Sequence, residues 1–133
     1  MSKPDEKPDE DEESLRLGKI RSEIVRLAQI KRSRERDYPN KWHPNSVLSP
    51  LGLPFTQASA WEFVADSFEE FEFSESLQDD PPGAIAYQMV VCLEDEQEIF
   101  IKVRLGKAGN KILGRSFHYS EGLKYQDKNE SID

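Results

Sequence analysis

The sequence predicts a single α+β domain, with two amphipathic helices packed on one face of an antiparallel sheet of three or more strands. Three observations predict this fold class. Apolar residues recur with helical spacing in the first half of the chain, apolar and polar residues alternate in the last third, and short turns separate the alternating runs. The length of 133 residues fits one domain, which we expect over residues 14–125.

Both ends of the chain are expected to lie outside this domain. Residues 1–13 contain seven acidic residues, two lysines and no apolar residue after Met1, so they cannot bury enough surface to offset the entropy of ordering. We therefore expect a disordered acidic N-terminal tail, and a flexible C-terminal tail at residues 126–133. The N-terminal tail carries −5 of the total charge of −8, which leaves −3 for residues 14–133. An ordinary RNA-binding domain is basic, so this balance argues against one.

Two helices are predicted from apolar spacing. The first covers about residues 13–34, and its apolar face is Leu17, Ile20, Ile24 and Leu27. Its basic far end is interpreted as favourable charge at a helix C-terminus, or alternatively as a second phosphate-contacting patch. Four prolines in residues 37–54 predict a loop without regular structure. Thr56 is then expected to cap a second helix with the apolar face Trp61, Val64, Ala65 and Phe68.

Three strands are expected in the last third of the chain, at residues 84–93, 99–105 and 112–119. The turns between them are short, which predicts an antiparallel meander. In the middle strand Ile99, Ile101 and Val103 share one face, which we expect to pack on the helices. Phe100, Lys102 and Arg104 share the other face, which we expect to be open and cationic.

Composition excludes several classes of site. The single cysteine, Cys92, lies in the apolar run YQMVVCL and is interpreted as a buried structural thiol, with a nucleophile as the alternative. The chain has no CxxC, no HExxH and no paired histidines, so we expect no metal and no cofactor. It has no signal-like segment and no long apolar run. We therefore expect a soluble, cytoplasmic protein without a membrane partner.

The candidate chemistry lies in residues 99–120, which contain five cationic residues and no acid. A cationic sheet face that carries an imidazole is typical of phosphate binding and, with proton transfer, of phosphodiester cleavage. Metal-free RNA cleavage needs a base, an acid and cations for the phosphorane charge. His118 is the candidate base or acid. The candidates for holding phosphate are Lys102, Arg104 and Arg115. The candidates for supplying a hydroxyl are Tyr119 and Tyr87.

Two alternatives stay open for these residues. Lysine and arginine on strands can serve only to prevent edge-to-edge aggregation, and a lone histidine can be an ordinary surface residue. Strand parity also places Ser116 and His118 on one face and Arg115 on the other, so His118 and Arg115 share a site only if a bulge intervenes.

The order of several short motifs resembles a known family. The chain has LGL at 51–53, an amphipathic helix, an F-x-x-S element at Phe73 and Ser76, a strand with Gln88, IFIK at 99–102 and SFH at 116–118. This order resembles the MqsR-type mRNA interferase toxins of type II toxin–antitoxin systems. The match covers about residues 48–119. The resemblance implies a RelE-like fold and a metal-independent endoribonuclease that a cognate antitoxin protein holds silent.

The resemblance also implies roles for individual residues. The family's strand glutamine matches Gln88, and its terminal-strand lysine falls on His118, which keeps the ability to transfer protons. Its tyrosine falls on Phe100 and its lysine in the F-x-x-S element on Glu75, so these two groups differ. The implied catalytic residues are His118, Gln88 and Lys102, and the implied substrate is single-stranded RNA, with no direct DNA contact.

Two further functions remain open from the sequence alone. One is a non-catalytic binding module of the same fold that uses its cationic sheet face for an acidic protein partner or nucleic acid. The other is a chain whose acidic tail folds over its own basic face and inhibits it.

Overall fold

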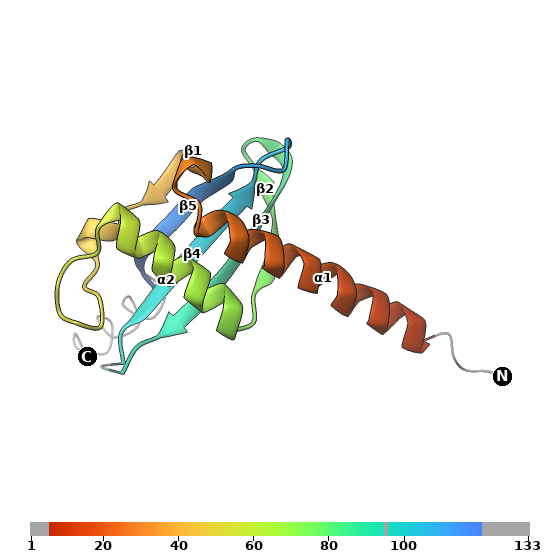
Figure 1. The fold of residues 1–133 in the computed structure, drawn as a ribbon, viewed down its shortest axis with the longest axis horizontal. Coiled ribbons are helices and arrows are strands. Elements are labelled where there is room, and N and C mark those ends of the chain that lie inside the picture. Colours follow the sequence, from red (N-terminus) through yellow and green to blue (C-terminus); the bar gives the residue numbers. More distant parts are fainter. Residues whose placement is uncertain (1–5, 95, 121–133) are drawn as a thin grey trace, which may run out of the picture.

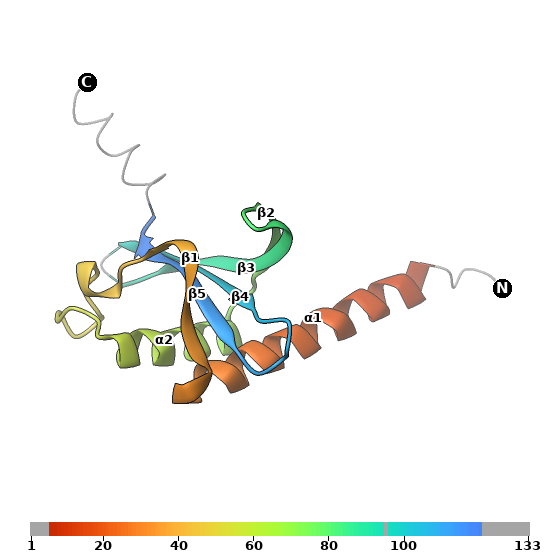
Figure 2. The ribbon, with the colours of Figure 1, turned by 90° about the horizontal axis from the view of Figure 1, so that it is seen from above.

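The computed structural model describes residues 6–94 and 96–120, and it confirms an α+β architecture (Figure 1). Two helices lie on one face of a five-stranded mixed sheet and leave the other face open (Figure 2). Within the described residues the elements are, in chain order, α1 (Glu6–Ala28), the 3₁₀ turn η1 (Lys31–Ser33), β1 (Arg34–Trp42), the 3₁₀ turn η2 (Pro44–Ser46), α2 (Gln57–Glu70), β2 (Ser74–Asp79), β3 (Pro82–Cys92), β4 (Glu98–Leu105) and β5 (Ile112–Tyr119).

The strand order in the sheet is β1-β5-β4-β3-β2. The predicted antiparallel meander is confirmed for β3, β4 and β5, and its strand bounds are close to those expected from alternation. The sheet is nevertheless larger than the three predicted strands. β2 adds antiparallel to β3, and β1 adds parallel to β5, which makes the sheet mixed rather than antiparallel.

The expectation of a helix to about residue 34 followed by an irregular loop is wrong, because β1 occupies this stretch. The α1 helix ends at Ala28, and the chain enters an edge strand at Arg34. Pro39 is compatible with this strand for two reasons. The strand lies at the sheet edge, and the pairing with β5 shifts register between Arg36 and Lys41, where Pro39 needs no ladder hydrogen bond.

The other edge strand, β2, follows an acidic run that offers no alternating apolar pattern. Its residues are mostly polar and exposed, as is usual where a strand borders solvent. Its last residue, Asp79, pairs with Pro82 across a tight turn. Figure 2 shows β2 curling away from the helices, on the side of the open face.

The α1 helix begins at Glu6, inside the segment that composition predicts to be disordered. The helix extends past the edge of the sheet on the helical side, so residues 6–13 do not fold back over the open face (Figure 1). Residues 1–5 and the predicted tail at 126–133 lie outside the described residues.

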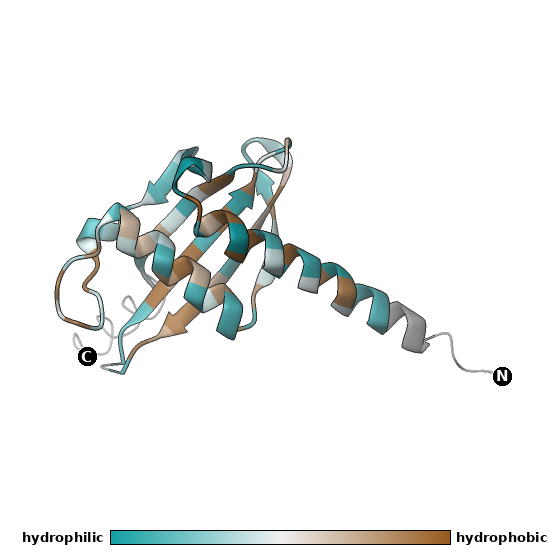
Figure 3. Ribbon diagram, viewed as in Figure 1, coloured by the Kyte–Doolittle hydropathy of each residue, from teal (hydrophilic) through white to brown (hydrophobic). Residues whose placement is uncertain are grey.

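The core lies between the helices and the sheet, where hydrophobic residues of β3, β4 and β5 lie beneath both helices (Figure 3). Both predicted apolar faces of α2 and β4 are buried, including Ile99, Ile101 and Val103 at 0 % exposure. Trp42 packs on Trp61 with a ring-centroid distance of 4.6 Å and on Phe117 at 5.4 Å. The core therefore fixes β1, β5 and α2 relative to one another.

Local signals explain two details of this frame. Thr56 accepts a hydrogen bond from the Ser59 amide while the Ser59 hydroxyl accepts one from the Thr56 amide, so the predicted cap of α2 is confirmed as a capping box. Cys92, in contrast, is exposed and not buried. Val91 faces the core, and alternation along β3 turns Cys92 to the opposite side.

The two glycines Gly114 and Gly18 should respond oppositely to alanine. A Cβ at Gly114 would lie 2.6 Å from ring atoms of the buried Trp42, so Gly114→Ala should destabilise the fold by about 1–3 kcal/mol through overpacking. A Cβ at Gly18, on α1, meets nothing within 4 Å, so Gly18→Ala should stabilise by up to about 1 kcal/mol. Urea unfolding of both variants measures the difference, and an unaffected Gly114→Ala protein would contradict the close packing of Trp42 on Gly114.

Candidate functional site

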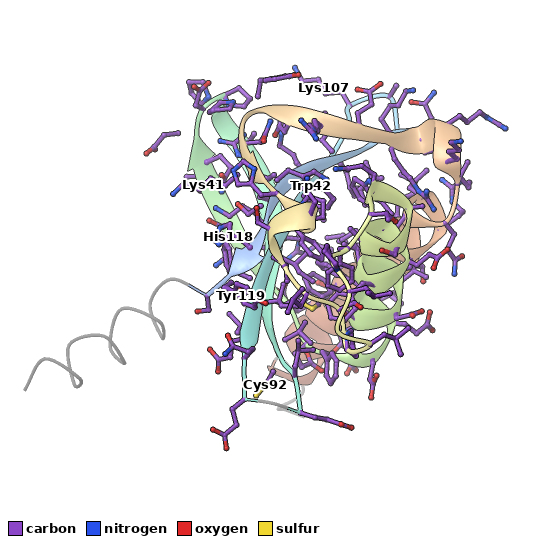
Figure 4. The ribbon with its side chains drawn as sticks, turned by 90° about the vertical axis from the view of Figure 1, so that its left-hand side faces the viewer. Lys41, Trp42, Cys92, Lys107, His118 and Tyr119 are labelled. Carbon is purple, nitrogen blue, oxygen red and sulfur yellow. The ribbon has the colours of Figure 1, made fainter. Side chains whose placement is uncertain are left out.

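The open face of the sheet contains a pocket of about 480 Å³, which we call the trough. Its floor comes from β4 and β5, one wall from the end of β1, and the opposite wall from the curled strand β2. Figure 4 shows Lys41 and His118 on this side of the sheet and Trp42 on the side of the helices. The lining residues are Pro39, Asn40, Lys41, Gln78, Phe100, Lys102, Arg115, Ser116, His118 and Ser120, none of which is acidic.

A bulge in β5 brings Arg115 to the same face as His118. Lys102 pairs with Ser116, whereas the next residue of β4, Val103, pairs with Gly114. Arg115 is therefore an extra residue without a partner on β4, which is how a bulge re-aims a side chain. The bulge that His118 and Arg115 need in order to share a site is therefore present. Arg115 lines the trough together with Ser116 and His118.

The carboxylate of Asp37 holds this bulge in place. Asp37 is 3 % exposed and accepts hydrogen bonds from Arg104 Nε at 2.8 Å, Arg104 Nη2 at 2.8 Å and Arg115 Nη1 at 2.9 Å. Burial by itself raises the pKa of the Asp37 carboxyl, but the two arginines, together with a hydrogen bond from the Tyr38 amide, outweigh it and bring the pKa to about 2. Asp37 is therefore ionised at neutral pH and neutralises one of the two arginine charges.

Lys102 lies on the floor of the trough. Burial lowers the pKa of Lys102, and the positive charges of Arg115 and Lys41 lower it further. Its ammonium lies 5.7 Å from the Phe100 ring centroid, and within the described part of the chain it has no acidic partner. A lysine that has no acidic partner there and lies among other cations favours the binding of an anion.

His118 is held in one orientation by its own strand. Its Nδ1 lies 2.8 Å from the Tyr119 carbonyl oxygen, which can only accept a hydrogen bond. The Nδ1 atom is therefore the donor, and in the neutral ring Nε2 carries the lone pair. The imidazole also lies against Phe100, with the ring centroids 5.5 Å apart. The trough thus contains a base with a fixed tautomer beside an aromatic surface.

Only some of the candidate residues that the sequence predicts line the trough. His118, Lys102 and Arg115 line the trough. Arg104 lies on the same face but is bound to Asp37, and Gln88 pairs with Lys102 without lining the trough.

The expectation that Tyr87 or Tyr119 supplies a hydroxyl to this site does not fit the geometry. Tyr87 pairs with the core residue Val103, and Tyr119 pairs with the core residue Ile99, so alternation turns both tyrosines toward the helices. The Tyr119 hydroxyl accepts a hydrogen bond from the Leu48 amide at 3.1 Å. Neither tyrosine lines the trough.

Sequence reasoning missed three residues of this region: Asp37, Lys41 and Gln78. The first two lie in a stretch that its prolines made look irregular, and Gln78 lies in a strand without an apolar pattern. One available signal was Gly114, because a glycine inside a strand often marks a bulge. It would have placed Arg115 on the correct face.

No group of three or more metal-ligating side chains occurs within residues 6–94 and 96–120, and no helix there is long and apolar enough to cross a membrane. Comparisons with protein-family models, with curated proteins and with solved structures gave no match.

The ion pair of Asp37 should make stability depend on pH. The pKa is lowered from 3.8 to about 2 in the folded state, so the stabilisation is complete above about pH 5 and is lost as the pH falls through 2. The stability advantage of the wild type over Asp37→Asn should therefore shrink by about 2 kcal/mol between about pH 6 and about pH 2. Urea unfolding across this range measures it. A constant difference would show that the carboxylate charge contributes nothing.

Proposed function

We propose that the trough binds single-stranded RNA through its phosphates. The observation that carries this proposal is the lining itself, which supplies Lys41, Lys102 and Arg115 from three different strands and, among the described residues, contains no carboxylate. Cations from several strands that converge on one open face fit a phosphate group. The half-buried position of Lys102 strengthens its attraction for an anion, because water screens it less there.

The floor of the trough favours a single strand over a duplex. Phe100 and His118 present two rings next to the cations, and unstacked bases of single-stranded RNA pack on such rings. Phe100 pairs with His118 and Lys102 pairs with Ser116 at the next same-face position, so the rings and the cations are neighbours along the strands. This order suits one base followed by its phosphate.

The same residues support cleavage of the bound phosphodiester. His118 Nε2 takes the proton of the ribose 2′-hydroxyl, the 2′-oxygen bonds to phosphorus, and the bond from phosphorus to the 5′-oxygen breaks. Lys102, whose pKa is lowered, donates a proton to the departing 5′-oxygen. Arg115 and Lys41 stabilise the charge of the phosphorane. The products are a 2′,3′-cyclic phosphate and a 5′-hydroxyl end.

The resemblance to MqsR-type toxins extends this proposal to a RelE-like endoribonuclease that a cognate antitoxin holds silent. The reversed charge at Glu75 does not oppose it. Glu75 pairs with Tyr87, which places it toward the helices, and its carboxylate binds Arg16 at 2.7 Å and 3.0 Å. The negative charge is therefore used in anchoring β2 to α1 and does not line the trough.

A non-catalytic binding module is the second candidate, and two observations favour it. Phe100 lacks the hydroxyl of the family's tyrosine, and the guanidinium of Arg104 is occupied by Asp37. A trough that binds phosphate without cleaving it needs neither group. The two candidates share the phosphate site and differ in whether His118 and Lys102 transfer protons.

Removing two trough cations should weaken RNA binding and reduce its dependence on salt. In the double variant Lys41→Ala with Lys102→Ala, the log–log slope of affinity against salt should fall by about 1.4, which is about 0.7 for each lost contact to a single strand. The matched control is Lys19→Ala with Lys107→Ala, which removes equal charge outside the trough lining. Fluorescence anisotropy with a labelled oligonucleotide measures both. Equal slopes for the two double variants would contradict a phosphate site in the trough.

His118→Ala should reduce cleavage of RNA in the presence of EDTA by a factor of about 10² to 10⁴, because a positioned base contributes about that much. His43→Ala is the control, since His43 is the other histidine of the chain, is exposed and does not line the trough. Product analysis by gel, with circular dichroism to verify folding, measures the effect. Unchanged cleavage by folded His118→Ala removes His118 from the mechanism. RNA binding without cleavage by the wild type selects the binding module.

A further inference from the structure

A buried glutamine forms part of the wall of the trough opposite β1. Gln78 is 7 % exposed, lines the trough and comes from the curled strand β2. A polar side chain that is buried this deeply is normally hydrogen-bonded at every atom that can bond. The partners of its amide therefore show what the side chain can still offer to a ligand.

Both hydrogens of the Gln78 amide are used within β2. Nε2 donates to the Ser76 carbonyl oxygen at 3.1 Å and to the Ser76 hydroxyl oxygen at 3.0 Å. The carbonyl oxygen can only accept, so it determines which end of the amide is the nitrogen. The Oε1 atom is left as an acceptor without a hydrogen-bond partner among the described residues. A buried acceptor in this state is destabilising until a donor reaches it.

The floor of the trough carries a second polar group of this kind. Ser116 is 6 % exposed, lines the trough, and its hydroxyl has no hydrogen-bond partner within the described chain. Two deeply buried polar atoms, Gln78 Oε1 and the Ser116 hydroxyl, face one pocket and have no partner in the part of the chain that the structure describes. They indicate a ligand with more polar atoms than a phosphate alone. Phosphate oxygens are acceptors and cannot satisfy Gln78 Oε1.

We propose that Gln78 reads the base of the bound RNA by accepting a hydrogen bond from an exocyclic amino group, so that the trough prefers adenine or cytosine to uracil. This inference rests on the RNA-binding function proposed above and names its specificity. The amino groups of adenine and cytosine project from the base edge as donors. Uracil has only its ring N–H as a donor on that edge, and two carbonyl oxygens flank it and repel a lone acceptor.

Ser76 acts as a positioning residue for this contact. Its hydroxyl and carbonyl together occupy both amide hydrogens and leave only an acceptor for the base. Loss of the hydroxyl in Ser76→Ala would free one N–H, which can donate to a uracil carbonyl. The preference against uracil should then weaken while the amide itself is still present.

The test compares affinities for short oligoadenylate, oligocytidylate and oligouridylate of one length. The wild type should bind the first or second about tenfold more tightly than the third, which is the discrimination one good base contact provides. Gln78→Met keeps the length of the side chain and removes the amide, so it should reduce the preference to within about twofold while leaving the salt slope unchanged. Ser76→Ala should strengthen binding to oligouridylate alone. Gln29→Met makes the same chemical change outside the trough and should alter nothing.

The outcomes separate the two proposals. Loss of base preference with an unchanged salt slope in Gln78→Met supports base reading by Gln78. A preference that survives in both Gln78→Met and Ser76→Ala, or a wild type without preference, overturns it while the phosphate site stands. A wild type that binds none of the three oligonucleotides overturns the proposed function itself, and base reading with it. Thermal melting of each variant verifies that it is folded.

Discussion

The buried carboxylate of Asp37 is the constraint on which the open face depends. It joins β1, which carries Asp37, to β4 through Arg104 and to β5 through Arg115. Two arginines on neighbouring strands would repel each other without it, and a buried charge left alone costs several kcal/mol. The carboxylate therefore stabilises the bulge of β5 and turns Arg115 into the trough. One negative charge between two arginines still leaves a net positive charge beside Lys41 and Lys102.

Net charge is a poor guide to what this protein binds, because the charges are separated in space. The chain carries −8 overall, yet no acidic side chain within residues 6–94 and 96–120 lines the trough. Acidic residues of α1 and of the end of α2 lie on the helical side, and Glu75 is bound to Arg16. Their long-range field slows the approach of an anion and is screened within about 10 Å at moderate salt. The local field of the trough is attractive, and it acts where the ligand binds.

Sequence periodicity predicts the parts of this fold that depend on burial. The helix faces and the alternation in β4 can be predicted because apolar residues stand at the positions that are buried, as Ile99, Ile101 and Val103 show. The edge strands are not visible in this way, since β1 and β2 are polar and held by backbone pairing. For the same reason Asp37, Lys41 and Gln78 escaped prediction, whereas His118 and Lys102 lie on strands whose parity could be read. The position of Arg115 depended on a bulge that parity alone cannot resolve.

The bulge also explains why the core and the trough are not independent. Gly114 is the residue before Arg115, and its missing side chain makes room for the ring of Trp42 on the helical face. Trp42 ends β1, the strand that carries Asp37 and Lys41, and packs on Trp61 of α2. A change in aromatic packing therefore shifts β1 relative to β5, and with it the carboxylate that orients Arg115. The geometry of the trough is in this sense set from the opposite face of the sheet, by the fit between a tryptophan and a glycine.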